Sequence, residues 1–519
     1  MVYHFEGNKE LHRIKPKVIN LRPFMLFRAV LIVFFIFICS TGVVRSQEML
    51  GTTLGNYAGI NSVQLNPSLM HNSKLWLDIE LTGTGMFIQN NYLYLSRSEF
   101  VLWDLFKPGY VLPSHLEDYG VEVRSFYRYD NSGNKNLFLN ARINGPGVMI
   151  NWGDHAFGLH TTVRSVSTLR NIPYHLANFL YLGLNYPPQQ DINYHSEKPF
   201  LVSQMSWFEA GISYAYKVYE KGFDRFDAGI SVRKLFGFAG LYMAGDNLDY
   251  IVPDDTTIQI NNLKADYGFS IPVDYSSNEP GMITDPLFSG GGWGFDLGVT
   301  YTRLRKVHQQ QYFERLCEQK HMDYVYRIGL SLIDVGGVKF KERAQTHRID
   351  NRSSTWENLS DFSFQTINQL MDTISYKFYG DESAAYTGDR FTLWLPSALS
   401  VQFDYHHFKN WYINGSLFLP VQFSQISLQR PAMIAITPRY ESRWFEANLP
   451  VSLYDWHQLR LGLSLRFYIL TIGTEKLGPY FGIGNFNGMD IYFTIKIPFE
   501  KGFCRLSGSS KTCPAYDNY

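Results

Sequence analysis

Strict alternation of apolar and polar residues over about ten positions is the feature that most constrains the fold of this chain. In residues 457–468 every second residue is apolar, and the residues between them are mostly polar or small. Side chains of a β-strand point alternately to opposite faces, so this segment has one apolar and one polar face. A tilted strand of about nine to eleven residues is long enough to cross a bilayer. The segment therefore predicts a strand whose apolar face contacts hydrocarbon.

The same alternation recurs along most of the chain. It is found in residues 136–144, 207–218, 226–233, 292–302, 324–332, 398–406, 411–419 and 489–499, and weaker repeats bring the total to about fourteen strands. Strands of a soluble sandwich average about five or six residues and bury their apolar faces against a second sheet. Closure of one sheet pairs every edge, and lipid covers the apolar face. We therefore predict an all-β fold, a closed transmembrane antiparallel β-barrel; a secreted soluble β-protein is the alternative.

The composition agrees with a membrane barrel. Aromatic residues make up 16% of the chain, and Tyr and Phe far outnumber Trp. Membrane barrels use such rings in girdles at both water interfaces. Lys and Arg total 47, as do Asp and Glu, so no net positive charge is available to attract nucleic-acid phosphates. We expect outer-membrane lipid as a partner and no nucleic acid.

The N-terminus resembles an export signal. A run of eleven residues ending at Cys39 has no charge and follows Arg22 and Arg28. It is too short for a membrane helix, which needs about twenty residues, and suits the apolar core of a signal peptide. We predict a signal peptide over residues 1–46, with Met25 as an alternative start, on a secreted precursor bound for a bacterial outer membrane. A single membrane anchor is the alternative.

The remaining chain divides into three parts. Residues 47–73 form a lead-in segment that is expected to fold into the lumen. Residues 74–499 are expected to form the barrel, and residues 500–519, where the alternation has stopped, form a tail.

Some segments within the barrel region are too polar or irregular for its wall. Residues 98–106 and 173–184 predict short helices, and a further helix is expected within 365–373. Residues 245–290 and 341–390 predict two long loops, while a tight turn is expected at Glu220-Lys221-Gly222. Long loops at one end and tight turns at the other are typical of outer-membrane barrels.

Three cysteines follow the predicted signal peptide: Cys317, Cys504 and Cys513. A disulfide between Cys504 and Cys513 would close a small loop in an oxidising compartment, and two free thiols are the alternative. No CxxC pair, HExxH motif or phosphate-binding glycine loop is present. We therefore predict no enzyme, cofactor or metal site; a membrane-embedded hydrolase stays a third hypothesis, because its Ser and His could meet only in the fold.

The polar faces of the predicted strands supply the candidate functional residues. They carry both signs of charge, which can cross-pair and plug a narrow lumen or can line a polar path that screens solutes. The candidate lumen-lining residues are Asp78, Glu80, Arg142, Glu209, Arg233, Asp296, Arg327, Asp404, Arg460, Arg466 and Lys496.

Several short motifs occur in a consistent order along the chain. They are Asn66-Pro67-Ser68, a predicted strand pair in 75–95 leading into the helix at 98–106, residues 292–298 and 331–336, Leu395-Pro396, and residues 495–499. In these motifs the chain resembles an uncharacterised family of Bacteroidota outer-membrane barrels, a domain-of-unknown-function grouping distantly similar to FadL-like fatty-acid transporters and PorV-like barrels. The resemblance implies an integral outer-membrane barrel with its N-terminal segment folded towards the lumen, and it carries no catalytic residues.

Two functions follow from these expectations. The first is passage or binding of a small hydrophobic or amphipathic solute. The second is a structural or accessory barrel that docks an envelope protein partner in a secretion or motility assembly. A lateral gap or a kinked strand with an apolar pocket under residues 47–73 would favour transport, whereas a lumen filled by paired charges, with both long loops forming one platform, would favour docking.

Overall fold

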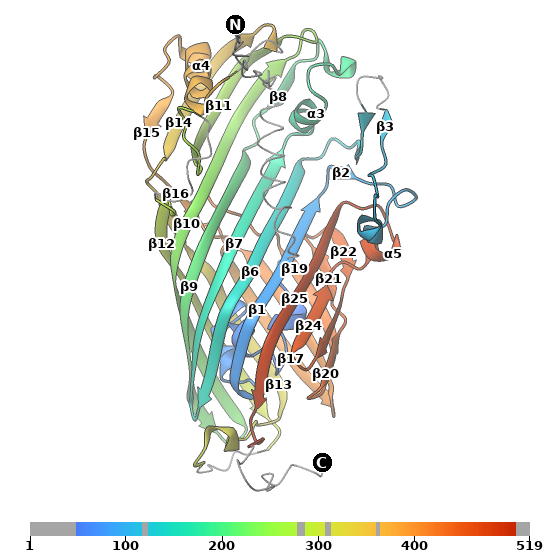
Figure 1. Ribbon diagram of the computed structural model, residues 1–519, viewed down its shortest axis with the longest axis vertical. Helices are drawn as coiled ribbons and strands as arrows, with labels where there is room; N and C mark the ends of the chain where they lie inside the picture. The colour runs from blue at the N-terminus through green and yellow to red at the C-terminus, as the bar shows by residue number, and fades with distance from the viewer. Residues whose placement is uncertain (1–47, 117–122, 278–285, 307–312, 360–363, 505–519) are drawn as a thin grey trace, which may run out of the picture.

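Fourteen antiparallel strands close into a barrel in the computed structural model (Figure 1). The structure describes residues 48–116, 123–277, 286–306, 313–359 and 364–504. The predicted signal peptide and most of the predicted tail lie outside these ranges. Closure is made by β1 (Leu75–Asn90), which pairs with β25 (Gly488–Glu500) on one side and with β6 (Lys135–Trp152) on the other. The predicted closed barrel of about fourteen strands is therefore confirmed.

The other wall strands follow one another round the barrel in chain order. They are β7 (His155–Ile172), β9 (Phe200–Lys221), β10 (Asp224–Ile251), β12 (Gly290–Leu304), β13 (Tyr324–Phe340), β17 (Ala398–Phe408), β18 (Trp411–Pro420), β19 (Met433–Glu441), β20 with β21 (Phe445–Asn448 and Val451–Tyr454), β22 with β23 (Gln458–Leu461 and Leu463–Phe467) and β24 (Leu470–Thr474).

The outer surface of the lower barrel is apolar. Because strand side chains alternate, each wall strand sends its apolar residues outward, and large aliphatic and aromatic side chains are exposed all round. Only hydrocarbon can cover such a belt favourably. The belt includes Phe157, Leu159, Ile212, Phe226, Ile230, Leu297, Val299, Ile328, Leu330, Phe403, Ile413, Ile434, Ile436, Leu459, Phe467 and Ile472.

One side of the barrel is much taller than the other (Figure 1). β10 has 28 residues, whereas β24 has 5. The upper part of β10 continues above the belt and pairs with β11 (Ile258–Ser270), which pairs with β14 (Gln345–Trp356). β15 (Tyr386–Gly388) and the helix α4 (Ile367–Tyr379) complete this upper extension, which we call the platform.

The platform corrects the prediction of two long loops. Segments 245–290 and 341–390 contain strands and a helix and pack against each other. They lack a membrane-type apolar face because water, not lipid, surrounds them above the belt. Their polar composition therefore reflects their height above the membrane and not a lack of secondary structure.

The short predicted helices are found with altered bounds. Residues 173–184 contain α3 (Tyr174–Leu182), and 98–106 contain only the 3-10 turn η3 (Leu102–Phe106). α4 begins after Thr366, whose side chain accepts a hydrogen bond from the Gln369 amide. The predicted strand pair in 75–95 is wrong, since β1 runs unbroken through most of it. Among the described residues, no helix is both long enough and apolar enough to cross a membrane.

The remaining elements are short. They are α2 (Leu50–Thr53), η1 (Gly59–Gln64), η2 (Pro67–Met70), β2 (Leu93–Tyr94), β3 (His115–Leu116), β4 (Val123–Arg124), β5 (Tyr127–Arg128), η4 (Pro187–Gln189), β8 (Tyr194–Ser196), η5 (Leu316–Glu318), β16 (Phe391–Trp394) and α5 (Gly478–Phe481).

Candidate functional site: the barrel interior

The N-terminal segment, residues 48–73, lies inside the lower barrel (Figure 1, blue). Its three turns, α2, η1 and η2, are buried and contact strands from many parts of the wall. The Leu50 amide donates to Glu475, the Ile60 amide donates to Asp78, and Asn56 donates to Glu441. The segment therefore meets wall residues on several sides of the barrel.

The Asn66-Pro67-Ser68 turn is the most closely fitted part of this segment. Asn66 donates to Gln402 at 3.1 Å, and Ser68 lies 2.6 Å from the Thr300 hydroxyl. The wall opposite the turn is glycine. A β-carbon at Gly229 would lie 2.6 Å from the carbonyl carbon of Pro67, and one at Gly298 would overlap the Asn66 side chain. Gly229 and Gly298 thus leave space for this turn.

Above the N-terminal segment, a layer of paired charges crosses the interior. We call it the Asp334 cluster: Arg164, Glu209, Arg233, Asp296, Asp334 and Arg430. Asp334 accepts from Arg164 at 2.7 Å, from Arg233 at 2.9 Å and from Arg430 at 2.6 Å. All six side chains are buried, and an unpaired buried ion costs several kcal/mol, so each charge stabilises its neighbours.

The wall is irregular beside the Asp334 cluster. Register shifts occur between Phe295 and Leu297 of β12 and across from them in β13. Asp334 has a φ of 58°, and its amide donates to Asp296 at 2.7 Å instead of to a neighbouring strand. The Asp296 carboxylate, which also pairs with Arg233, therefore holds this irregular stretch of β13 in place.

The eleven residues predicted to line the lumen are all buried. Arg233, Glu209 and Asp296 meet in the Asp334 cluster, while Arg142 donates to Gln64 of the N-terminal segment. The others lie lower or on the opposite wall, each with its own partner. These contacts are Lys496 with Asp78, Asn144 with Glu80, Asn56 with Arg327, Arg439 with Asp404, Gln458 with Arg460 and Glu446 with Arg466.

Sequence reasoning missed the residues that hold these charges together. Asp334 lies in the short motif 331–336, which predicts no role for it. Arg164 lies in β7, whose alternation is interrupted by Thr and Ser. Arg430 lies in a loop, where no periodicity marks its direction. The signal that could have found them is charge balance, since three acidic side chains need cationic partners in a closed interior.

The upper interior is apolar. Going up β9, the inward residues change from Glu209 to Trp207 and Met205, and going up β10 they change from Arg233 to Leu235 and Tyr242. These belong to a buried cluster that we call the apolar layer: Val166, Met205, Trp207, Leu235, Tyr242, Val338, Phe340, Ala344, Phe391, Leu393, Leu395 and Leu428. A second buried apolar cluster, under α3 and α4, continues above it.

The loop between β18 and β19, residues 421–432, crosses this upper interior. The Leu428 amide donates to Trp394 of β16, and the Thr168 hydroxyl of β7 donates to Gln429. Leu428 itself is buried in the apolar layer. A cavity of about 20 Å³ remains beside Arg142, His160 and Glu209, room for about one water molecule. The N-terminal segment, the Asp334 cluster and this loop therefore occupy successive levels of the described interior.

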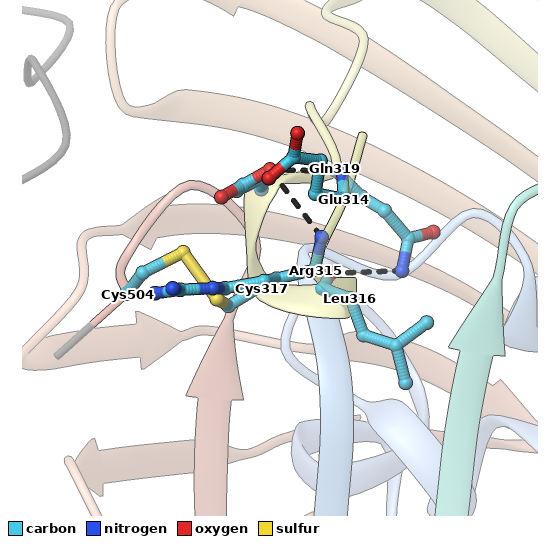
Figure 2. Close-up of a disulfide and its surroundings, with 7 residues drawn as sticks. Glu314, Arg315, Leu316, Cys317, Gln319 and Cys504 are labelled. Atoms are coloured by element: carbon cyan, nitrogen blue, oxygen red, sulfur yellow. Dashed lines mark hydrogen bonds between the residues drawn. A yellow bond between two sulfur atoms is a disulfide. The ribbon is translucent and has the colours of Figure 1, made fainter. Parts of the chain in front are cut away.

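A disulfide braces the lower mouth of the barrel. Cys317, in the connection between β12 and β13, bonds to Cys504, which follows β25 (Figure 2). Gln319 beside it donates to Asn151 and accepts from the Gly153 amide on the β6–β7 turn. Residues 313–323 thus reach from one part of the rim to two others and form a floor under the N-terminal segment.

This disulfide corrects the predicted bridge between Cys504 and Cys513. A cysteine can form only one disulfide, and the structure pairs Cys504 with Cys317 at a Cα separation of 5.4 Å. Cys513 lies outside the described residues. The two bonded cysteines are 187 positions apart, so barrel closure and not sequence proximity brings them together.

The described residues offer no metal centre. No group of three or more His, Cys, Asp and Glu side chains in those ranges is arranged to hold a metal ion.

Comparisons place this architecture among known proteins. Residues 67–475 match the model of a family described as "Family of unknown function (DUF5723)". No curated protein sequence matches the chain.

Three solved structures are similar to this chain at low sequence identity. The Ralstonia pickettii toluene transporter TbuX has 10% identity and a TM-score of 0.38, with 86% of this chain and 96% of that chain covered. The P. putida toluene transporter TodX has 10% identity and a TM-score of 0.37, with 86% and 95% covered. A Pseudomonas aeruginosa FadL homologue has 11% identity and a TM-score of 0.28, with 88% and 99% covered. Values this low assign no function to this chain.

Proposed function

This chain belongs to the DUF5723 family of unknown function, and from that premise we propose that it is an integral outer-membrane barrel that binds or passes a small hydrophobic or amphipathic solute. The belt supports the membrane position, because its exposed apolar side chains surround the lower barrel. Tight turns at the lower end and long structured extensions at the upper end support an orientation with the platform outside the cell.

The apolar layer is the observation that carries the proposal. A water-filled porin has a polar interior, whereas here twelve buried apolar residues fill the barrel above the Asp334 cluster. Along β9 and β10 this apolar interior continues upward from Trp207 and Leu235 to Phe200 and Tyr250, beneath α3. Replacing these apolar contacts with contacts to a hydrophobic solute would cost little free energy, because apolar burial is not directional.

In this proposal, two segments of the chain close the passage. Residues 421–432 occupy the apolar layer from above, and residues 48–73 fill the barrel below the Asp334 cluster. The described contacts of both segments with the wall are hydrogen bonds, ion pairs and apolar packing, which can exchange with a solute or with water.

The test is solute binding by the purified barrel. We expect bound hydrophobic molecules to be identified by mass spectrometry after purification from outer membranes in mild detergent. The Leu428→Ala variant should bind an environment-sensitive apolar dye more strongly, because it loosens the loop in the apolar layer. Ile434→Ala, which removes a lipid-facing side chain from the adjacent strand β19, is the matched control. Equal dye binding by both variants, with no bound solute, would overturn the proposal.

A docking barrel is the second candidate function. The filled interior favours it. The platform favours it as well, because β11, β14 and α4 pack into one unit through buried apolar residues such as Ile258, Ile349 and Phe378. A stoichiometric protein that co-purifies with an empty barrel, and is lost when the platform is shortened, would favour docking over transport.

A further inference from the structure

A small unit projects from the low side of the barrel at the top of β24 and β25 (Figure 1). It consists of residues 95–112, which contain η3, and residues 477–486, which contain α5; we call it the ledge. Leu95 and Phe486 exchange backbone hydrogen bonds of 2.8 and 2.9 Å, so two segments far apart in the sequence form one unit. Leu95, Phe100, Leu102 and Tyr480 form its buried core.

The ledge packs on the outside of the barrel wall. In β25, Asp490 and Tyr492 point inward, and Tyr492 accepts a hydrogen bond from the Gly51 amide of the N-terminal segment. Met489 and Ile491 therefore point outward, and both pack against the core of the ledge. Further down the same outward row, Ile497 and Phe499 are exposed in the belt. The ledge thus covers the top of a lipid-facing row.

The free side of the ledge is apolar as well. Phe106 is 72% exposed and Ile483 is 70% exposed, and Trp103, Leu105 and Phe481 are also more than half exposed. The Trp103 ring lies 5.9 Å from Phe106 and 5.6 Å from Tyr480, so these side chains form one patch over η3 and α5. Such a patch costs free energy in water, at about 25 cal/mol per Å² of apolar surface. Some apolar phase or partner therefore covers it.

We propose that the ledge is a membrane-interface anchor whose exposed face is inserted into the outer leaflet beside the barrel. Its patch is continuous with the belt through the outward row of β25, and the belt is already the surface that the proposed function assigns to lipid. Trp and other aromatic residues favour the boundary between headgroups and acyl chains. The paired charges of Asp104 and Lys107, 2.7 Å apart on the same turn, then lie at the headgroup level.

The ledge also explains the uneven height of the barrel. On the low side, β24 and β25 end near the top of the belt, and the ledge supplies the apolar surface at that level. On the high side, β9 and β10 continue through the boundary into the platform. An anchor on the low side fixes the depth and tilt of the barrel in the membrane, because the low side then ends in the membrane interface while the high side continues beyond it.

A fluorescence experiment in lipid vesicles tests this anchor. Cys39 and Cys513 are replaced by serine, so a thiol-reactive polarity probe attaches only to an introduced cysteine. The probe is placed at Phe106→Cys on the ledge, at Leu297→Cys in the belt as the lipid-facing control, and at Tyr386→Cys on the platform as the water-facing control. Each protein is folded into vesicles with and without lipids that carry a nitroxide quencher near the headgroup.

We expect the Phe106→Cys probe to show blue-shifted emission and to lose most of its intensity with quencher lipids, as the Leu297→Cys probe does. The Tyr386→Cys probe should keep its emission in both kinds of vesicle. Water-like emission at Phe106→Cys, with lipid-like emission at Leu297→Cys, would overturn the anchor and assign the patch to a protein partner. Water-like emission at Leu297→Cys would overturn the membrane position of the barrel itself, and the anchor with it.

Discussion

The lower and upper halves of the barrel interior are filled by different segments with a different balance of contacts. Below, residues 48–73 meet the wall through buried apolar side chains such as Leu50 and Ile60 and also through many hydrogen bonds, as at Asn56 and Asn66. Above, residues 421–432 place Leu428 among buried aliphatic and aromatic side chains. Polar contacts are directional and hold one arrangement, whereas apolar contacts accept a range of shapes. The comparison suggests a fixed plug below and an exchangeable filling above.

Breaking the Asp334 cluster, which divides the two halves, should have the largest effect. The Asp334→Asn variant leaves Arg164, Arg233 and Arg430 without the charge that they share, and we expect a loss of about 3–5 kcal/mol in the free energy of unfolding. Urea unfolding in lipid vesicles measures this loss. Asp224→Asn removes a half-exposed partner of Arg303 and should cost at most about 1 kcal/mol. Equal losses in the two variants would contradict a stabilising role for the cluster.

Removing the Cys317–Cys504 disulfide tests the floor under the lower half. The double variant Cys317→Ser with Cys504→Ser should lose about 2–4 kcal/mol of stability, because the bond restricts the unfolded chain. Trypsin should then cleave faster after Arg315 and Lys320, which lie in the floor segment. Cys513→Ser is the control. Unchanged cleavage in the double variant would mean that the hydrogen bonds of Gln319 hold the floor without the disulfide.

A side chain added at Gly229 tests the fit of the plug. Gly229→Ala places a β-carbon against the backbone of Pro67 and Ser68, so we expect a loss of about 1–3 kcal/mol in the free energy of unfolding, measured by urea unfolding in lipid vesicles. Gly415→Ala, on β18, adds a methyl group with no atom within 4 Å and should leave the stability unchanged. Equal stability of the two variants would mean that the turn at Pro67 is not closely fitted to the wall.

The smallest expected effect concerns the platform, which lies above both halves. Burial lowers the pKa of His347 from 6.5 to about 4, and its ring stacks on Tyr267 at 5.1 Å. Since the unfolded imidazole binds a proton at a higher pH than the folded one, the platform should lose stability as the pH falls from about 6.5 towards 4. Hydrogen exchange of the β11 amides at pH 7 and pH 5 measures this. His347→Phe should abolish the pH dependence, and His195→Phe, at an exposed site, should retain it.

The barrel could be predicted from the sequence because alternation is a local property. The alternation within a single strand predicts which side chains face lipid and which face inward, as in residues 489–499 and 292–302. The burial of side chains in β25 and β12 follows that pattern. The candidate lumen residues were selected by the same rule, and all eleven are buried, although their role as the lining of a solute path stays a prediction.

The partners of those residues could not be predicted, because alternation gives a direction and no neighbour. Asp334 binds Arg164 across 170 positions, and Arg430 reaches it from a loop. The polar composition of the platform predicts two loops, because its strands lack the apolar outer face that marks a wall strand. The pairing of the cysteines depends on which segments meet at the lower mouth, where the β12–β13 connection lies beside the end of β25, and proximity in the sequence favours the wrong pair.

The sequence by itself determined that the chain makes long two-faced strands, that these close into a barrel, and that charged side chains face its interior. Only the tertiary structure decided what fills that interior, which charges pair, and which cysteines join. The physical reason is range: the face of a strand follows from the side chains next to each other in the chain, whereas plugging, charge pairing and disulfide formation depend on which distant residues closure brings within a few ångströms.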